Sequence, residues 1–206
     1  MPVPNQIPPT LDAVQVRPGG RSGRVRDAVL AAAREELLDG GWEAFSHRAT
    51  ARRAGVDPAT VYRRWPTRPR LAVDALLELA DDAVPVPDTG VLAADLDLFL
   101  RSVQAVLSDA RLLQFFHALS VASGSDDDDL REMVGAFWRR RFEQAGAMIT
   151  RGIDRGELPT AVDSHEIIER LVAPLYFRAL ISGEPLDESL IRGSIESALA
   201  QNTGGA

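Results

Sequence analysis

The chain has 206 residues, of which 45% are hydrophobic and 26% are charged, and its formal net charge is −7. It has no cysteine, which excludes disulfides and cysteine-based metal or redox sites and favours a reducing cytoplasm as the location. No apolar stretch has the roughly 18 residues that a membrane span requires, and the first residues form no apolar core of a signal peptide, so we expect neither.

The first predicted helix follows a segment rich in Pro and Gly, residues 1–22, which we expect to be a disordered arm. Arginines near the end of this arm could reach a DNA minor groove, although a solvated tail is the alternative. Residues 24–39 carry apolar side chains at helical spacing, which predicts a helix. Gly40 and Gly41 then favour its end, because glycine is common just past a helix C-terminus.

Two short helices joined by a tight turn are predicted next. Ser46 is a favourable N-cap for a helix over residues 46–54, and Gly55 can adopt the positive φ of a turn. Asp57 is then a favourable N-cap for a third helix, which has a proline in its first turn and ends near Trp65.

The remaining sequence is also predicted to be helical. Residues 68–83 fit a fourth helix, and the sequence "VPVPDTG" breaks the pattern after it. Further helices are predicted over residues 91–108, 110–123, 128–155, 164–182 and 187–201. No alternating pattern typical of strands stands out, so the fold class that we expect is all-α with about nine helices.

Charge of opposite sign accumulates in the two parts of the chain. Residues 1–71 hold 12 Arg and 7 acidic residues, a net charge of +5, whereas residues 72–206 hold 11 Arg and 23 acidic residues, a net charge of −12. A basic part on an acidic remainder indicates that the first part binds a polyanion. A chance cluster of solvated charges is the alternative.

Three positions in the second and third helices have the spacing of a DNA-binding helix-turn-helix. Ala51 is small where the two helices would cross, Gly55 follows four residues later, and Val61 follows six residues after that. With Val61 inward, the other side chains of the third helix face solvent or a partner, and several carry groups suited to DNA. A helical hairpin of neutral role would also satisfy this spacing.

Residues 25–76, "VRDAVLAAAREELLDGGWEAFSHRATARRAGVDPATVYRRWPTRPRLAVDAL", resemble the N-terminal domain of the TetR family of transcriptional regulators. The features that carry the resemblance are Gly41-Trp42, Ala54-Gly55-Val56, Thr60-Val61-Tyr62, an aromatic residue after them, and Arg68. The chain departs from the family pattern at His47 and Thr50 instead of aliphatic residues, at Arg64 instead of the commoner His, and at Trp65 instead of the commoner Phe. These departures leave the operator sequence open.

The resemblance implies a role for individual residues and for two domains. It implies base or groove contacts from Arg48, Pro58, Ala59 and Arg63. It implies phosphate contacts from Thr60, Tyr62, Arg64 and Arg68. The ring of Tyr62 could also pack on the first helix while its hydroxyl reaches a phosphate. The domains would be a helix-turn-helix DNA-binding domain over residues 23–70 and a larger ligand-binding and dimerisation domain over residues 71–203.

For the second domain, the resemblance implies a dimer in which the last two long helices of each subunit form a four-helix interface. The apolar residues available for this interface are Leu171, Leu175, Phe177, Leu180, Ile191, Ile195 and Leu199. Some of these residues would belong to the core of their own subunit instead of the interface. The candidates for a ligand pocket between the middle helices are Phe115, Phe116, His117, Trp138, Phe142 and Tyr176. An ordinary helical core is the alternative for these residues.

The remaining motifs predict neither a metal site nor a catalytic site. The acidic run over residues 126–129 precedes a helix that it can cap, and we expect no metal there. We see no nucleophile elbow, phosphate loop or catalytic carboxylate pair, and therefore expect no enzyme and no cofactor. We expect a homodimeric, ligand-responsive regulator of a double-stranded DNA operator, most often a repressor in this family. The alternatives are an activator or ligand-independent regulator, a helical enzyme, and a helical adaptor.

Overall fold

The computed structural model describes residues 21–200, and this part of the chain is helical without a strand. Its elements are α1 (Arg21–Ala44), α2 (His47–Ala54), α3 (Pro58–Arg64), α4 (Arg68–Ala83), α5 (Leu92–Ser108), α6 (Ala110–Ala122), α7 (Asp128–Asp154), α8 (Ser164–Phe177), a π-helical turn η1 (Arg178–Ser182) and α9 (Glu188–Ala200). The predicted all-α class is confirmed. Among the described helices, none is both long enough and apolar enough to cross a membrane.

The helix boundaries follow local sequence signals, with three differences from the prediction. The arm predicted over residues 1–22 lies outside the described residues, except that Arg21 and Ser22 begin α1. Gly41 breaks α1 with φ 64° and ψ −171°, and a short helical stretch follows as far as Ala44. The helix predicted over residues 164–182 is divided, because Pro174 lies inside α8 and the chain continues from Arg178 as a π-helical turn.

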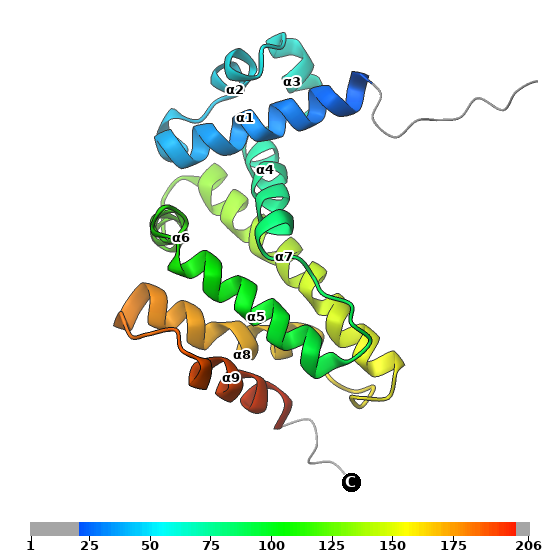
Figure 1. Ribbon diagram of the computed structural model, residues 1–206. Coiled ribbons are helices and arrows are strands. Elements are labelled where there is room, and N and C mark those ends of the chain that lie inside the picture. The colour runs from blue at the N-terminus through cyan, green and yellow to red at the C-terminus, as the bar shows by residue number, and fades with distance from the viewer. Residues whose placement is uncertain (1–20, 201–206) are drawn as a thin grey trace, which may run out of the picture.

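The helices are arranged along one long molecule with α1–α3 at one end (Figure 1). Helix α4 runs away from these three helices and packs along α7. Helices α8 and α9 lie at the end opposite to α2 and α3. Helix α4 therefore connects α1–α3 to the larger group of helices.

The buried side chains form two clusters, and one of them extends across both parts of the chain. The first contains residues of α1–α4 together with Leu119 of α6 and Met133 and Phe137 of α7. The second contains residues of α5, the C-terminal half of α7, α8 and α9. The domain boundary that we propose near residue 70 therefore does not coincide with a break in the hydrophobic core.

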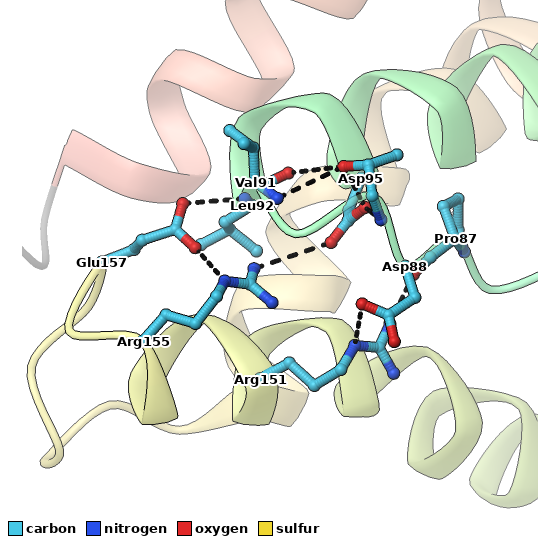
Figure 2. A network of polar contacts seen from close by, with 9 residues as sticks. Pro87, Asp88, Val91, Leu92, Asp95, Arg151, Arg155 and Glu157 are labelled. Carbon is cyan, nitrogen blue, oxygen red and sulfur yellow. Dashed lines mark hydrogen bonds and ion pairs between the residues drawn. The ribbon is translucent and has the colours of Figure 1, made fainter.

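A buried carboxylate fixes the beginning of α5 (Figure 2). The Asp95 side chain is fully buried and accepts hydrogen bonds from the backbone N–H and the hydroxyl of Thr89, both at 2.7 Å. The carboxylate of Glu157 accepts the N–H of Leu92 at 2.8 Å. Two acidic side chains thus satisfy backbone groups in the loop before α5 and in its first turn, where negative charge also complements the helix dipole.

Arginines at the end of α7 bind this same region. The Arg151 guanidinium lies 3.3 Å from a carboxylate oxygen of Asp88 and also donates to the carbonyl of Pro87. The Arg155 guanidinium lies 3.7 Å from the Oδ2 atom of Asp95. The C-terminal end of α7 is therefore tied to the loop that precedes α5 (Figure 2).

Candidate nucleic-acid interface and internal cavity

The ends of α2 and α3 are fixed by two side-chain caps and one glycine turn. The Ser46 hydroxyl caps α2 by accepting the N–H of Ala49 at 3.2 Å, and Asp57 caps α3 by accepting the N–H of Ala59 at 2.7 Å. Between them Gly55 has φ 67° and ψ 32°, a left-handed conformation that strains residues with a side chain. The predicted tight turn at Gly55 is confirmed.

The packing positions predicted from the spacing are buried. Ala51 and Val61 have no exposed surface, and both belong to the cluster that α1 and α4 complete. Because Val61 points into this cluster, the rest of the short α3 helix is left at the surface. The arrangement is that of a helix-turn-helix at one end of the molecule (Figure 1).

We define the α2–α3 surface as the residues of these two helices for which DNA contacts were predicted. They are Arg48, Pro58, Ala59, Thr60, Tyr62, Arg63 and Arg64. All are exposed except Thr60, which is half-buried. Sequence reasoning did not include Arg52 and Arg70, which are exposed next to this segment and could have been found by counting its cations.

Arginines of the α2–α3 surface differ from most others in the chain because they lack acidic partners. Within residues 21–200, Arg48, Arg63 and Arg64 form no ion pair, and Arg64 lies over the ring of its neighbour Trp65 at 5.6 Å. By contrast, Arg53 on the same helix as Arg48 binds Glu36 and Asp39 of α1. The positive charge of this surface is therefore not neutralised by the protein.

A histidine supports the tyrosine of the α2–α3 surface. The His47 ring is buried and stacks on the Tyr62 ring with centroids 4.3 Å apart and an interplanar angle of 12°. Its Nε2 atom lies 2.8 Å from the carbonyl oxygen of Trp65, which identifies this nitrogen as the donor of a hydrogen bond. The Tyr62 ring thus packs on the first residue of α2, and 46% of Tyr62 remains exposed.

The predicted phosphate ligand Arg68 is engaged within the protein. Its guanidinium lies 3.9 Å from the centroid of the Trp42 ring and 3.4 Å from the Oδ2 atom of Asp127. The indole N–H of Trp42 donates to the same oxygen at 2.9 Å. We call these three side chains the α1–α4–α7 junction, because they come from the end of α1, the first residue of α4 and the residue that caps α7.

The junction also orders the beginning of α7. Asp127 caps this helix by accepting the N–H of Leu130 at 3.1 Å, which confirms the capping role predicted for the acidic run. The indole N–H of Trp42 and the backbone N–H of Leu130 hold the pKa of Asp127 below its ordinary value, and the charge of Arg68 adds to this effect. The carboxylate therefore remains ionised and paired at neutral pH.

Another polar link joins α6 to the helix-turn-helix. The guanidinium of Arg111 lies 3.2 Å from Glu35 and 2.7 Å from Asp39, both on α1. Asp39 also accepts a hydrogen bond from Arg53 of α2 at 2.9 Å. One carboxylate of α1 is thus shared by arginines of both parts of the chain.

An internal cavity lies between α4, α5, α6, α7 and α8. Its volume is about 50 Å³, measured over the positions open to the centre of a water molecule. That measure corresponds to about three to five waters. The wall is apolar and rich in aromatic rings, and α4 contributes Leu76, Leu79, Ala80 and Ala83 to it.

The structure places five of the six candidate pocket residues in the cavity wall. They are Phe115, Phe116, Trp138, Phe142 and Tyr176. His117 is a correction: it is exposed on α6 and does not line the cavity. Successive helical residues point about 100° apart, so His117 is turned away when Phe116 faces the cavity.

Sequence reasoning missed the charged residue of the cavity wall, Arg141. Only 7% of this residue is exposed, and it donates a hydrogen bond to the carbonyl of Val84. A sequence signal existed, because Arg141 lies four residues after Phe137 and four residues before Ala145, on the buried stripe of α7. It could not be distinguished by sequence from its neighbours Arg139 and Arg140, which are exposed.

Two family models match the chain. Residues 29–74 match the model for bacterial regulatory proteins of the tetR family. Residues 86–198, more than half of the chain, match the model for the tetracyclin repressor-like C-terminal domain. The helix-turn-helix falls within the first match and α5–α8 fall within the second, whereas the part of α4 that lines the cavity lies between the two matches.

Curated proteins and solved structures are similar over most of the chain. HTH-type transcriptional regulator AqdR of Rhodococcus erythropolis is 32% identical over 87% of this chain and 86% of its own. The uncharacterised HTH-type regulator YdeS of Bacillus subtilis is 31% identical over 86% of this chain and 92% of its own. The crystal structure of the TetR family transcription regulator SCO0332 has a TM-score of 0.70 at 28% identity, covering 86% of this chain and 97% of that one.

Proposed function

The chain belongs to the TetR family of bacterial DNA-binding transcriptional regulators, and we propose that it is a homodimeric repressor that a small molecule releases from its operator. Its family consists of regulators and not enzymes. The observation that carries the release step is the position of α4. Its first residue, Arg68, belongs to the α1–α4–α7 junction, and four later residues line the cavity.

The proposed DNA contacts divide into two kinds. Arg48, Pro58, Ala59 and Arg63 would contact base edges or the groove, with the Arg63 guanidinium suited to guanine. Thr60, Tyr62, Arg64 and Arg68 would contact phosphates. Support comes from the exposure of the α2–α3 surface and from its lack of acidic partners among the described residues. The acidic remainder of the chain would be repelled by the duplex and would keep the complex in one orientation.

The proposed dimer would form through α8, η1 and α9. Among the apolar residues predicted to form it, Leu171, Leu175 and Ile191 are buried in their own subunit. Phe177 is 58% exposed and Ile181, a neighbour that we had not included, is 72% exposed. Exposed apolar side chains at the end of α8 and in η1 are typical of an interface. Two subunits would place their α3 helices in half-sites about one DNA turn apart.

The proposed release mechanism is a shift between two dimer conformations. A drug-sized ligand needs a pocket of about 300 Å³ or more, so the cavity would have to expand to accept one. Because α4 forms part of its wall, expansion would move α4 and the junction at its beginning. A ligand that binds only the expanded form then lowers the population that fits the operator, by no more than its difference in affinity for the two forms.

The proposal is tested by footprinting the chain on the DNA upstream of its own gene, with a reporter assay of the same promoter. We expect protection of two half-sites, and a loss of affinity of about 10²- to 10⁴-fold between about 50 and 200 mM salt, because four to eight arginines per dimer would displace counterions. Deleting the gene should raise transcription from the promoter. Reduced transcription after deletion would mean an activator, and absence of protection at any salt would exclude this DNA as the operator.

Replacing Asp127 by Asn should tighten binding to DNA by about two- to tenfold, because Arg68 would lose its competing carboxylate in both subunits. The amide can still cap α7, so the fold should be kept. The measurement is a titration of operator DNA followed by fluorescence anisotropy. Asp129→Asn is the matched control, since it removes the same charge from the first turn of α7, where Asp129 is exposed and forms no ion pair with a described residue. Equal changes for both variants would show that only net charge matters.

A further inference from the structure

The polar groups of the cavity wall are few and lie on α7 and α8. Arg141 is its sole charged residue among the described ones, and Tyr176 supplies a hydroxyl. The phenol ring of Tyr176 is held edge-on by Phe116 and Trp138, with centroids 5.6 Å and 5.4 Å away. A ligand in this cavity would therefore meet aromatic rings, aliphatic side chains and one guanidinium.

The guanidinium of Arg141 is incompletely satisfied. It donates to the carbonyl of Val84, but its Nη1 atom is buried and has no hydrogen-bond partner. The Oδ1 atom of Asp81 lies 3.6 Å from this nitrogen, and half of that carboxylate is exposed to solvent. The face of the Phe99 ring lies 5.6 Å from the guanidinium carbon and offers only a cation–π contact.

The electrostatics of the site favour an anion. Burial lowers the pKa of Arg141 and raises the pKa of Tyr176, because the site disfavours the charged form of each group, and the acidic partner of the buried Arg141 is the half-exposed Asp81. A buried cation is stabilised by a partner that brings negative charge and acceptors with it. A neutral ligand could accept a hydrogen bond but would bring no negative charge, and a cationic ligand would be repelled.

We propose that the effector is a hydrophobic organic acid whose carboxylate pairs with Arg141 and accepts a hydrogen bond from Tyr176 while its apolar body lies among the aromatic rings. This inference rests on the proposed function, because it identifies the class of ligand for the same cavity. A carboxylate offers two acceptor oxygens to the fork of a guanidinium. The carboxylate would displace Asp81 as the partner of Nη1.

The test uses two sets of matched probes that differ only in the polar group. They are 4-phenylbutyrate, 4-phenylbutanamide and 4-phenylbutylamine, and 2-naphthoate, 2-naphthamide and 2-naphthylmethylamine. Isothermal titration calorimetry of the full chain should show that at least one acid binds about tenfold or more tightly than its amide, with the amine weakest. Equal affinity for acid and amide, or no binding of any probe at millimolar concentration, would overturn the inference.

Two variants test whether the guanidinium of Arg141 causes the preference for the acid over the amide. Arg141→Met keeps the length of the side chain without its charge, and it should abolish the difference between acid and amide. Replacing a buried cation by an apolar residue is often neutral or stabilising, so the thermal midpoint should not fall. Asp81→Asn alters an exposed residue outside the cavity wall and should tighten the acid by about two- to fivefold, because it removes the competing carboxylate. The inference would be contradicted if the Arg141→Met chain still bound the acid more tightly than the amide. It would also be contradicted if Asp81→Asn lowered the affinity for the acid.

The same samples separate this inference from the proposed function. If the acid binds with the expected preference but leaves the affinity for operator DNA unchanged, the ligand class stands and release by this ligand fails. If the acid releases DNA from the wild-type chain and from Arg141→Met equally, the proposed release stands and the role of Arg141 fails.

Discussion

A chain carrying both Arg63→Gln and Arg64→Gln is expected to bind operator DNA about 10²- to 10⁴-fold more weakly than the wild-type chain near physiological salt. Both residues are exposed and form no ion pair with a described residue, so the loss would not come from broken ion pairs within the described part of the protein. A bidentate contact to guanine contributes about 1–3 kcal/mol to discrimination between bases. Each lost phosphate contact also removes the favourable release of counterions, a contribution to affinity that falls as the salt concentration rises. A dimer loses each contact twice.

The single variants should separate the two proposed roles. Arg63→Gln should relax the preference at one base position of each half-site, whereas Arg64→Gln should weaken binding to all sequences alike and reduce the salt slope by about two per dimer. The measurement is a set of anisotropy titrations on the operator and on single-base variants at several salt concentrations. Loss of the same preference in both variants would refute this division.

The control for charge lies on α7. Arg139→Gln with Arg140→Gln removes the same two charges per subunit from exposed residues that form no ion pair with described residues. We expect less than about a twofold change, because long-range attraction between solvated charges is screened at physiological salt. A loss as large as that of the Arg63 and Arg64 variant would mean that DNA responds to total charge rather than to the α2–α3 surface.

Replacing Trp65 by Ala should lower the free energy of unfolding by about 3–5 kcal/mol. The side chain is buried with 2% exposure, and its indole N–H donates to the Oδ2 atom of Asp74 at 2.9 Å. Truncation leaves a cavity between α3 and α4 and an unpaired carboxylate. Urea denaturation followed by circular dichroism measures the change, which corresponds to a fall in the thermal midpoint of about 6–20 °C for a chain of this size.

Trp65→Phe is the matched control, because it keeps an aromatic ring and removes the indole N–H. We expect it to cost about 1–2 kcal/mol, which is the value of one hydrogen bond with some loss of packing. If Trp65→Ala costs no more than Trp65→Phe, the ring does not anchor α3 on α4 and the helix-turn-helix is held chiefly by its other buried residues.

The fold was predictable because its signals are local. Ser46, Gly55 and Asp57 set the ends of α2 and α3 through contacts within four residues, and the predicted bounds of residues 68–83 coincide with those of α4. Capping and turn chemistry depend on neighbouring residues, so a single sequence reveals them. The break of α1 at Gly41 was visible for the same reason.

Side-chain partners from distant segments were not predictable. Arg68 meets Asp127 across 59 positions of the chain, and no local pattern distinguishes a phosphate ligand from such a pair. Helical periodicity also did not show that His117 turns outward or that Arg141 is buried while Arg139 and Arg140 are exposed. These outcomes depend on which neighbouring helix covers each face, which is settled by tertiary packing.

Because the C-terminal end of α7 is held in place, a tilt of this helix would move its N-terminal end the most. The helix has 27 residues and is about 40 Å long, and its C-terminal end is pinned by Arg151 and Arg155. Measured from that pivot, Asp127 lies about twice as far along the axis as Arg141 does, so a displacement of about 1 Å at the cavity becomes about 2 Å at Asp127 if the helix stays straight. The 2.9 Å bond from Trp42 to Asp127 cannot stretch that far. We therefore expect that a ligand that displaced α7 by this amount would break the bond between Trp42 and Asp127.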